Sequence, residues 1–149
     1  MEFSDFMNIE MIYLKKIEEP EDNCLRLTLI RTNISNISED IPIRDKIISN
    51  VHSIDCDFTK PLIQVDFDRY IGYSVLNESF ASLDEYNEFD GNAFRLFKKS
   101  RYLDFIKVAT FASDDYPAPF KHYEIACLNH VIDVVSVDEP SIKEIEENS

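Results

Sequence analysis

The segment spanning residues 120–140, FKHYEIACLNHVIDVVSVDEP, constrains the fold of this chain more than any other part of the sequence. Apolar and polar residues alternate along residues 123–127, and this period of two is typical of a half-buried β-strand. Residues 131–135 are richer in β-branched side chains, as in a strand that is buried on both faces. One strand of this total length would far exceed the usual length of about 5–6 residues. The segment therefore predicts two strands with a break near residues 128–130.

Strand-like alternation also occurs in much of the chain before this segment. Two alternating segments flank the turn-forming sequence Pro-Glu-Asp-Asn at residues 20–23, and this pattern predicts a β-hairpin. Within residues 62–67, the side chains of Ile63, Val65 and Phe67 share one side and should face the core. Residues 33–52 give no clear pattern. The segments with strand character are residues 9–18, 24–32, 53–57, 62–67, 70–80 and 94–98.

One segment has helical periodicity. Ser100 is a suitable N-cap, and apolar residues then recur at the spacing of one helix face as far as about Ala112. The pattern predicts an α+β fold with a mainly antiparallel, curled sheet that could close into a barrel, and one principal helix near residues 100–112. The predicted core residues are Ile63, Val65, Phe67, Phe105, Ile106, Ile125, Ile132 and Val134.

Length and composition are those of one domain. The chain has 149 residues, of which 44% are hydrophobic and 12% aromatic, so it can form a substantial core. Only two residues are glycine, which argues against a glycine-rich loop that binds phosphate. We predict a single domain spanning residues 1–149, with a charged tail from about residue 141 that should be frayed.

The charge of the chain limits the partners that it can bind. The formal net charge is −14, from 29 acidic and 15 basic residues. Phosphates would be repelled, so neither nucleic acid nor a membrane surface is expected as a direct ligand, whereas a basic protein is the natural complement. The first residues lack the basic region of a signal peptide, and the three cysteines are widely spaced. These features predict a cytoplasmic protein with free thiols.

No motif predicts catalysis. His122, Cys127 and His130 are residue types that bind metals, but on a continuous strand the two histidines would face one side and Cys127 the other. Cys127 could also pair with either histidine as a nucleophile, with Asp133 as the orienting acid, although nothing in the spacing selects this arrangement. The sequence therefore predicts no catalytic residue, no metal ligand and no cofactor.

One pair of carboxylates is a further candidate for acid–base chemistry. Asp66 and Glu78 could act together if their strands are neighbours. The favoured interpretation is that both residues lie on the solvent side of a half-exposed sheet, where such acids are common.

The polar segment 81–92, ASLDEYNEFDGN, is the main candidate for a protein-binding surface. Its acidic residues would steer a basic partner and its aromatic residues would anchor it. The sequence equally allows the aromatic rings to point inward and the acids to be merely solvated. Acidic residues after the predicted helix form a second candidate. The predicted partner-binding residues are Asp84, Glu85, Tyr86, Glu88, Phe89, Asp90, Asp114 and Asp115.

Three segments in the second half of the chain together resemble small immunity proteins of bacterial contact-dependent and polymorphic toxin systems. They are YSVLNESF at residues 73–80, FRLFKKSRYLDFI at residues 94–106, and KHYEIACLNHVIDVVSVDEP at residues 121–140. The resemblance implies a cytosolic protein without catalytic activity that binds one cognate toxin domain. Toxins of this kind are often basic nucleases, which agrees with the acidic charge of the chain.

The sequence thus predicts an immunity protein that neutralises a basic toxin domain, such as a nuclease, by occluding its active face. Two other functions remain open. One is an acidic mimic of nucleic acid that blocks a basic cleft. The other is a small-ligand-binding domain or an enzyme, with a pocket in the curled sheet lined by Tyr70, Tyr73, Tyr123 and His122.

Overall fold

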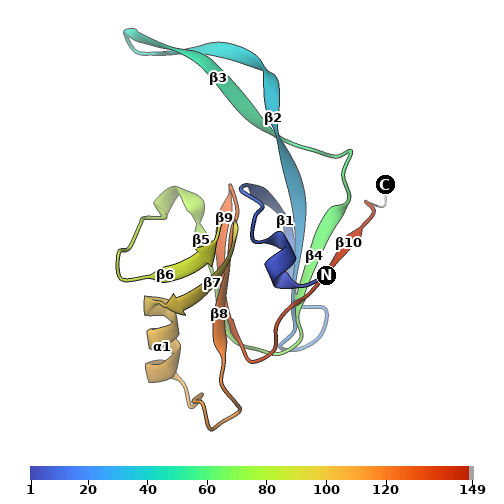
Figure 1. The fold of residues 1–149 in the computed structure, drawn as a ribbon, viewed down its shortest axis with the longest axis vertical. Helices are drawn as coiled ribbons and strands as arrows, with labels where there is room; N and C mark the ends of the chain where they lie inside the picture. Colours follow the sequence, from blue (N-terminus) through green and yellow to red (C-terminus); the bar gives the residue numbers. More distant parts are fainter. Residues whose placement is uncertain (148–149) are drawn as a thin grey trace.

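The computed structural model describes residues 1–147, including all their side chains except those of residues 35–39, 41, 43 and 48–53. Two five-stranded sheets face each other across a shared core, and one α-helix lies on the outer side of the second sheet (Figure 1). Every strand pair is antiparallel. The predicted α+β class with one principal helix is confirmed, and the sheets do not close into a barrel.

The first sheet has the strand order β1-β2-β4-β10, with β3 paired to the far part of β2. Its strands are β1 (Ile12–Glu18), β2 (Leu25–Ile43), β3 (Lys46–Cys56), β4 (Leu62–Phe67) and β10 (Ser141–Ile145). The second sheet has the order β5-β9-β8-β7-β6. Its strands are β5 (Tyr70–Asn77), β6 (Glu88–Gly91), β7 (Phe94–Lys99), β8 (Lys121–Ala126) and β9 (His130–Ser136).

Alternating side chains from both sheets form the core. Leu25, Leu27 and Leu29 of β2 are fully buried against residues of the second sheet. The short 3-10 helix η1 (Phe3–Phe6) adds Phe3, whose ring contacts Tyr123 edge-on at 5.1 Å between ring centroids. The predicted core residues that the structure confirms as buried are Ile63, Val65, Phe67, Ile106, Ile125, Ile132 and Val134.

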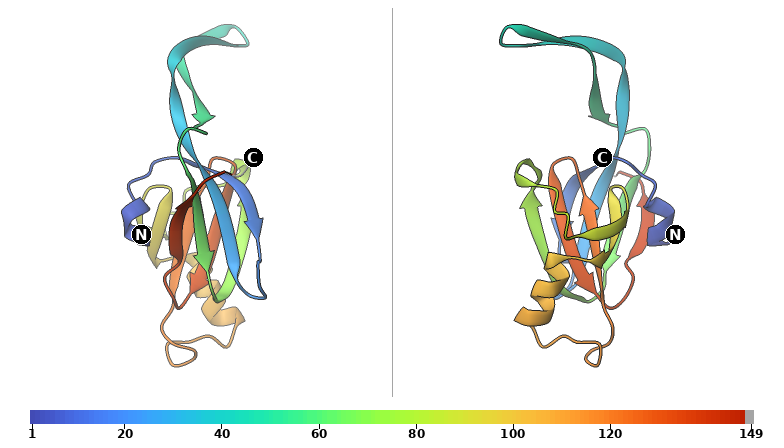
Figure 2. Two further views of the ribbon diagram at one scale, coloured as in Figure 1. Left: turned by 90° about the vertical axis from the view of Figure 1, so that its right-hand side faces the viewer. Right: turned by 60° about the vertical axis from the view of Figure 1, so that its left-hand side comes forward.

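The predicted hairpin of residues 9–18 and 24–32 is confirmed as the pair β1–β2. Beyond this pairing, β2 continues together with β3 as a two-stranded arm that extends away from the two sheets (Figure 2). Residues 33–52, which show no clear pattern in the sequence, belong to this arm.

The C-terminal segment differs from the sequence prediction. Residues 141–145 form β10, which pairs with β4, and Ile142 is buried in the core. The prediction of a frayed tail from about residue 141 is therefore wrong for this part. Strand pairing outweighs the local charge, because each polar side chain of β10 can face solvent while the backbone is paired.

The predicted break in the segment 120–140 lies between β8 and β9. The Cys127 N–H donates to the His130 carbonyl at 2.7 Å, which closes a tight turn. Within this turn, the Asn129 amide accepts from the Leu14 N–H at 3.0 Å and donates to the Leu14 carbonyl at 2.9 Å. The turn thereby supplies hydrogen-bond partners for the Leu14 backbone of β1 and connects the two sheets.

The helix α1 (Arg101–Ala109) begins where the sequence predicts but ends earlier than Ala112. Ser100 is the N-cap, and its Oγ accepts from the Leu103 N–H at 3.0 Å. Ile106 packs onto Gly72 of β5, where an added Cβ would lie 2.9 Å from Ile106 Cδ1. Phe105 was predicted to be buried but is 59% exposed, because the face of α1 that meets the sheet is centred on Ile106.

Within residues 1–147, no helix combines the length and the apolar character that crossing a membrane requires.

Candidate binding cleft

The outer face of the second sheet carries a cleft of about 490 Å³ beside the loop that follows β5. Because successive side chains of a strand point to opposite faces, the residues that alternate with core residues on β7, β8 and β9 line its floor. Arg95, Glu124 and Asp133 lie directly opposite one another on these three strands and form one row across the sheet. His122 lies two residues before Glu124 and faces the same side.

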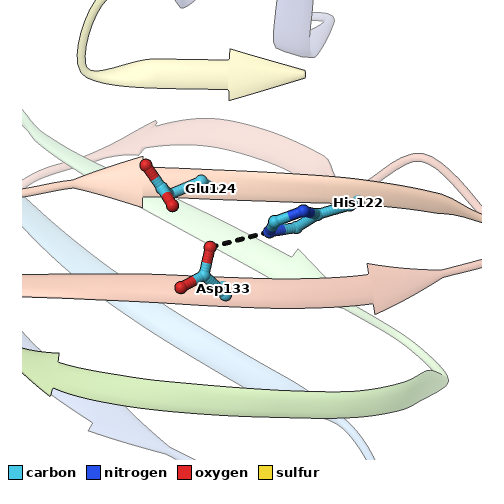
Figure 3. Close-up of side chains that lie close together, drawn as sticks. All are labelled: His122, Glu124 and Asp133. Carbon is cyan, nitrogen blue, oxygen red and sulfur yellow. Dashed lines mark hydrogen bonds and ion pairs between the residues drawn. The ribbon is translucent and has the colours of Figure 1, made fainter. Parts of the chain in front are cut away.

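A chain of hydrogen bonds leads from the helix to this row. Ser100 Oγ lies 2.7 Å from His122 Nδ1. On the other side of the ring, His122 Nε2 lies 2.7 Å from Asp133 Oδ1, and Figure 3 shows this second contact. Ser100 Oγ already accepts from the Leu103 N–H, so its own proton is free to donate to Nδ1. The tautomer that satisfies all these groups therefore carries its proton on Nε2 and donates it to Asp133.

His122 is held as a neutral imidazole. Its side chain is 1% exposed and stacks on Phe97, with 4.2 Å between ring centroids and 11° between the planes. The Tyr102 ring covers it from α1 at 5.3 Å. This burial lowers the pKa of His122 to about 4, because the charged form would lose its hydration.

Glu124 and Asp133 form a carboxyl pair at the floor of the cleft. Carboxylate oxygens of the two side chains lie within 4.8 Å of each other, and Glu124 Oε1 accepts from Arg95 Nη1 at 2.9 Å. Burial, together with the neighbouring Asp133 carboxyl group, raises the pKa of Glu124 to about 8, although Arg95 opposes the shift. Burial also raises the pKa of Asp133. The pair therefore retains a proton near neutral pH.

The serine, histidine and aspartate of this network are the residue types of a hydrolase triad, but their arrangement does not suit nucleophilic attack. Ser100 is 1% exposed, and its Oγ is engaged by both the Leu103 N–H and the His122 ring. A nucleophilic hydroxyl must reach the substrate as well as its base. The position of Ser100 as helix N-cap accounts for its hydrogen bonds.

A metal ion could use His122, Glu124 and Asp133, whose candidate ligand atoms all lie within 4.8 Å of one another. Two features oppose this use. The Nε2 atom that would bind the metal carries the proton given to Asp133, and the Arg95 guanidinium already donates to Glu124. A bound metal would have to displace that proton and compete with that guanidinium.

Most combinations weighed from the sequence are not brought together. Cys127 lies in the core on the side of the sheet opposite His122, and burial raises the pKa of its thiol to about 12, so it is no nucleophile. Asp66 pairs with Arg26 in the first sheet, whereas Glu78 follows β5 in the second. These two acids therefore do not form a catalytic pair.

The pocket proposed for a ligand between three tyrosines and a histidine is also divided by the sheet. Tyr123 contributes to the core, and Tyr70 and Tyr73 pack against that core. His122 points to the outer face, as neighbours along a strand must. No shared pocket is formed.

The acidic loop is more tightly held than its sequence suggests. The Tyr86 hydroxyl donates to Asp104, and the Tyr86 ring lies between Lys99 Nζ at 4.2 Å and the Arg101 guanidinium carbon at 4.6 Å. Arg101 Nε also donates to Asp84 at 2.5 Å. Tyr86 therefore stabilises the loop against the start of α1, and is not a free anchor.

The other predicted partner-binding residues lie at two separate places. Phe89 packs against Phe97 at 5.1 Å between ring centroids, and the Arg95 guanidinium carbon lies over the Phe89 ring at 4.4 Å from its centroid. Asp90 pairs with Lys98 at 3.4 Å. Glu85 and Glu88 are exposed, as is Asp90, whereas Asp114 and Asp115 lie in the exposed turn between α1 and β8.

Four residues of the cleft are absent from the candidates that the sequence predicts: the exposed apolar residues Phe80 and Leu83 at its edge, and Arg95 and Glu124 of its floor. Phe80 and Leu83 line the cleft and are 77% and 98% exposed. Glu124 and Asp133 face each other because the tight turn of residues 127–129 fixes the register of the β8–β9 hairpin. Counting outward from that turn could have identified this pair, since two acids opposed across a hairpin are unfavourable without compensation.

Comparison with known proteins gives no assignment, because no family model, no curated protein and no solved structure matches this chain.

Proposed function

We propose that this protein is a cytoplasmic immunity protein that binds a basic toxin domain and covers its active face. The observation that carries this proposal is the pair of exposed apolar side chains, Phe80 and Leu83, on a loop without any basic residue. Exposed large apolar side chains within a polar surface are typical of protein-binding sites. Such residues would anchor a partner that the surrounding acids attract.

The positions of the segments that resemble immunity proteins support the same face. Residues 73–80 form most of β5 and the 3-10 helix η2 (Glu78–Phe80), and residues 94–106 form β7 and most of α1. Residues 121–140 contain β8 and β9. All three segments therefore belong to the second sheet and its helix, the part of the molecule that carries the cleft.

The charge of the whole chain supports a basic partner. The formal net charge is −14, and residues 78–91 contain five acids, Glu78, Asp84, Glu85, Glu88 and Asp90, with no lysine, arginine or histidine. A field of one sign accelerates the encounter with a partner of the opposite sign.

Protection of growing cells tests the proposal. Candidate toxin domains, chosen from the genes that neighbour the gene for this chain, would each be expressed alone and together with this protein. We expect growth arrest with the toxin alone and normal growth with both. Phe80→Ser/Leu83→Ser should lose protection, because the apolar anchors are gone. Phe58→Ser is the matched control, since Phe58 is exposed next to the first sheet, and it should protect fully. Arrest that the wild-type protein leaves unchanged would contradict the proposal.

A second candidate function, binding of a small molecule, is favoured by the cleft itself. Its volume falls in the range of about 300–1,000 Å³ that is usual for ligand sites, and it contains a carboxyl group with a strongly raised pKa. Native mass spectrometry of the protein purified without denaturation tests this function. A stoichiometric small-molecule adduct that is lost in Glu124→Gln would favour it over the immunity function.

A further inference from the structure

We propose that the cleft on the second sheet is a socket for one long basic side chain, arginine or lysine, whose charged end meets Glu124 and Asp133. The identity of the partner that supplies this side chain rests on the immunity function proposed above. The socket itself rests on the geometry and charge of the cleft.

The floor of the cleft contains more acidic than basic groups. Glu124 and Asp133 are opposed by one guanidinium, that of Arg95, and the neutral His122 contributes a donor but no charge. If both carboxyl groups were ionised, the floor would therefore carry one uncompensated negative charge in a largely buried place. Buried charges need a partner, so a proton or an external cation must occupy this position.

The walls suit the methylene stem of a basic residue. Leu76, Phe80, Leu83 and Val131 line the cleft with apolar surface above the acidic floor. Lysine and arginine bury their aliphatic stems against apolar surface while their charged ends reach polar groups. The exposed rings and methyl groups of this rim would be covered when the side chain enters.

Charge also selects against the other ligand classes. A phosphate or carboxylate would meet Glu124 and Asp133 at the floor and Asp84 and Glu85 in the lining. A divalent metal would compete with Arg95 for Glu124. A guanidinium or ammonium group avoids both conflicts, because it brings hydrogen-bond donors and positive charge to the two carboxyl groups and displaces only a proton.

Binding of the cation is therefore coupled to release of that proton. The titratable and charged groups next to Glu124 are Asp133 from β9, Arg95 from β7 and the neutral His122 from β8, and the acids Asp84 and Glu85 of the loop line the same cleft. Its pKa of about 8 means that the proton must leave at any lower pH before the cation binds. Affinity should rise roughly tenfold from pH 6 to pH 7 and become nearly constant above about pH 9.

The test is an NMR titration of the full-length protein with N-acetyl-arginine amide, with N-acetyl-citrulline amide as the neutral isostere. We expect the arginine probe to shift the amide signals of Leu76, Leu83, Glu124 and Asp133, and the citrulline probe to have at least tenfold weaker effect. Equal binding of both probes, or shifts confined to other parts of the protein, would overturn the proposal. So would stoichiometric zinc binding at these residues without any response to arginine.

Variants make the test specific. Asp133→Asn retains an oxygen that can accept from His122 Nε2 but removes the charge, and it should weaken arginine binding about tenfold or more. Asp66→Asn is the matched control on the first sheet and should bind as the wild type does. Leu83→Ala removes apolar wall at a position that is 98% exposed, so it should fold normally and bind more weakly. Unchanged binding in both Asp133→Asn and Leu83→Ala would overturn the socket.

The outcomes also separate the socket from the immunity function. Arginine binding by a protein that gives no protection against the toxin would leave the socket standing and overturn its assignment to a toxin. Full protection by the wild-type protein, combined with no binding of the arginine probe to that protein, would overturn the socket and leave the immunity function standing.

Discussion

At the scale of single residues, the opposed acids Glu124 and Asp133 are the least expected feature of the molecule. Like charges directly opposite each other destabilise a strand pair, and here they also lie largely buried. Arg95 and the proton that the pair retains weaken the repulsion between the two carboxyl groups, but the groups remain opposed within a largely buried site. Residues that break a local rule in this way are concentrated at functional sites, which is why the cleft is the candidate site.

The proton on this pair makes stability depend on pH. At Glu124 the folded protein binds more protons than the unfolded chain between the ordinary pKa of 4.5 and the folded pKa of about 8. The free energy of unfolding should therefore decrease as pH rises, by up to about 1.4 kcal/mol per pH unit from this group. Glu124→Gln should remove this decrease, because glutamine can still accept from Arg95 and never ionises.

Urea denaturation at pH 6.5 to 8 measures this effect best. His122, with a folded pKa of about 4, contributes an opposite slope, but only between pH 4 and its ordinary pKa of 6.5. Glu85→Gln, at an exposed position of the loop, is the control and should keep the slope of the wild type. Identical slopes for Glu124→Gln and the wild type would show that Glu124 is already ionised at neutral pH.

Part of this site could be predicted from the sequence, whereas the rest depends on which distant parts of the chain come into contact. His122 and Asp133 are recognisable as reactive residue types within a strand-forming segment. Their connection through Ser100 and Arg95 depends on the sheet order β7-β8-β9 and on the docking of α1, which involve contacts between distant parts of the chain. Period and composition report which face a residue occupies, but not which strand lies beside it.

At the scale of elements, short sequence patterns correctly predict those features that interactions between neighbouring residues determine. The N-cap at Ser100, the break at residues 127–129 and the core face of β4 all follow from short-range patterns and are confirmed. The strand β10 has weak local signals, and its pairing with β4 joins residues far apart in the sequence. The end of α1 and the exposure of Phe105 likewise follow from where the helix meets the sheet.

The two neighbouring residues Phe105 and Ile106 test that orientation of α1. Ile106→Ala should lower the free energy of unfolding by about 2–5 kcal/mol, because it leaves a cavity between α1 and the second sheet. Phe105→Ala should change it by less than about 0.5 kcal/mol, since that side chain is mostly exposed. Chemical denaturation of both variants provides the comparison, and a larger loss for Phe105→Ala would mean that the helix is rotated from its described position.

Gly72 tests how closely the helix approaches the sheet. Gly72→Ala would place a Cβ 2.9 Å from Ile106 Cδ1, so it should destabilise the protein by about 1–3 kcal/mol. Ile106→Val removes the opposing methyl group, and the double variant should recover part of the loss. Additive effects of the two substitutions, measured in a double-mutant cycle, would show that these atoms do not meet.

At the scale of the whole molecule, the two sheets have different roles. The first sheet supplies one side of the core and extends into the β2–β3 arm (Figure 2). The second sheet supplies the other side of the core and presents the cleft on its outer face. The excess of acids over the whole chain adds a long-range attraction for a basic partner that no single residue accounts for.

This charge predicts which residues set the rate of association. Asp84 and Asp90 are engaged by Arg101 and Lys98, so among the loop acids Glu85 and Glu88 should contribute most to steering. Glu85→Gln/Glu88→Gln should slow association with the toxin domain at low salt and leave dissociation nearly unchanged. Stopped-flow measurements check this, and unchanged association at low salt would move the site of encounter elsewhere, such as the turn with Asp114 and Asp115.

The most direct test that this face binds a basic toxin is the kinetics of the isolated toxin domain with wild-type protein and with Phe80→Ala/Leu83→Ala. Rates would be measured at ionic strengths of about 0.01 M and about 1 M, where the screening length falls from about 30 Å to about 3 Å. We predict that salt slows association similarly for both proteins, and that the double substitution accelerates dissociation at least tenfold at either salt concentration. Association that does not respond to salt, together with unchanged dissociation in the variant, would contradict this account.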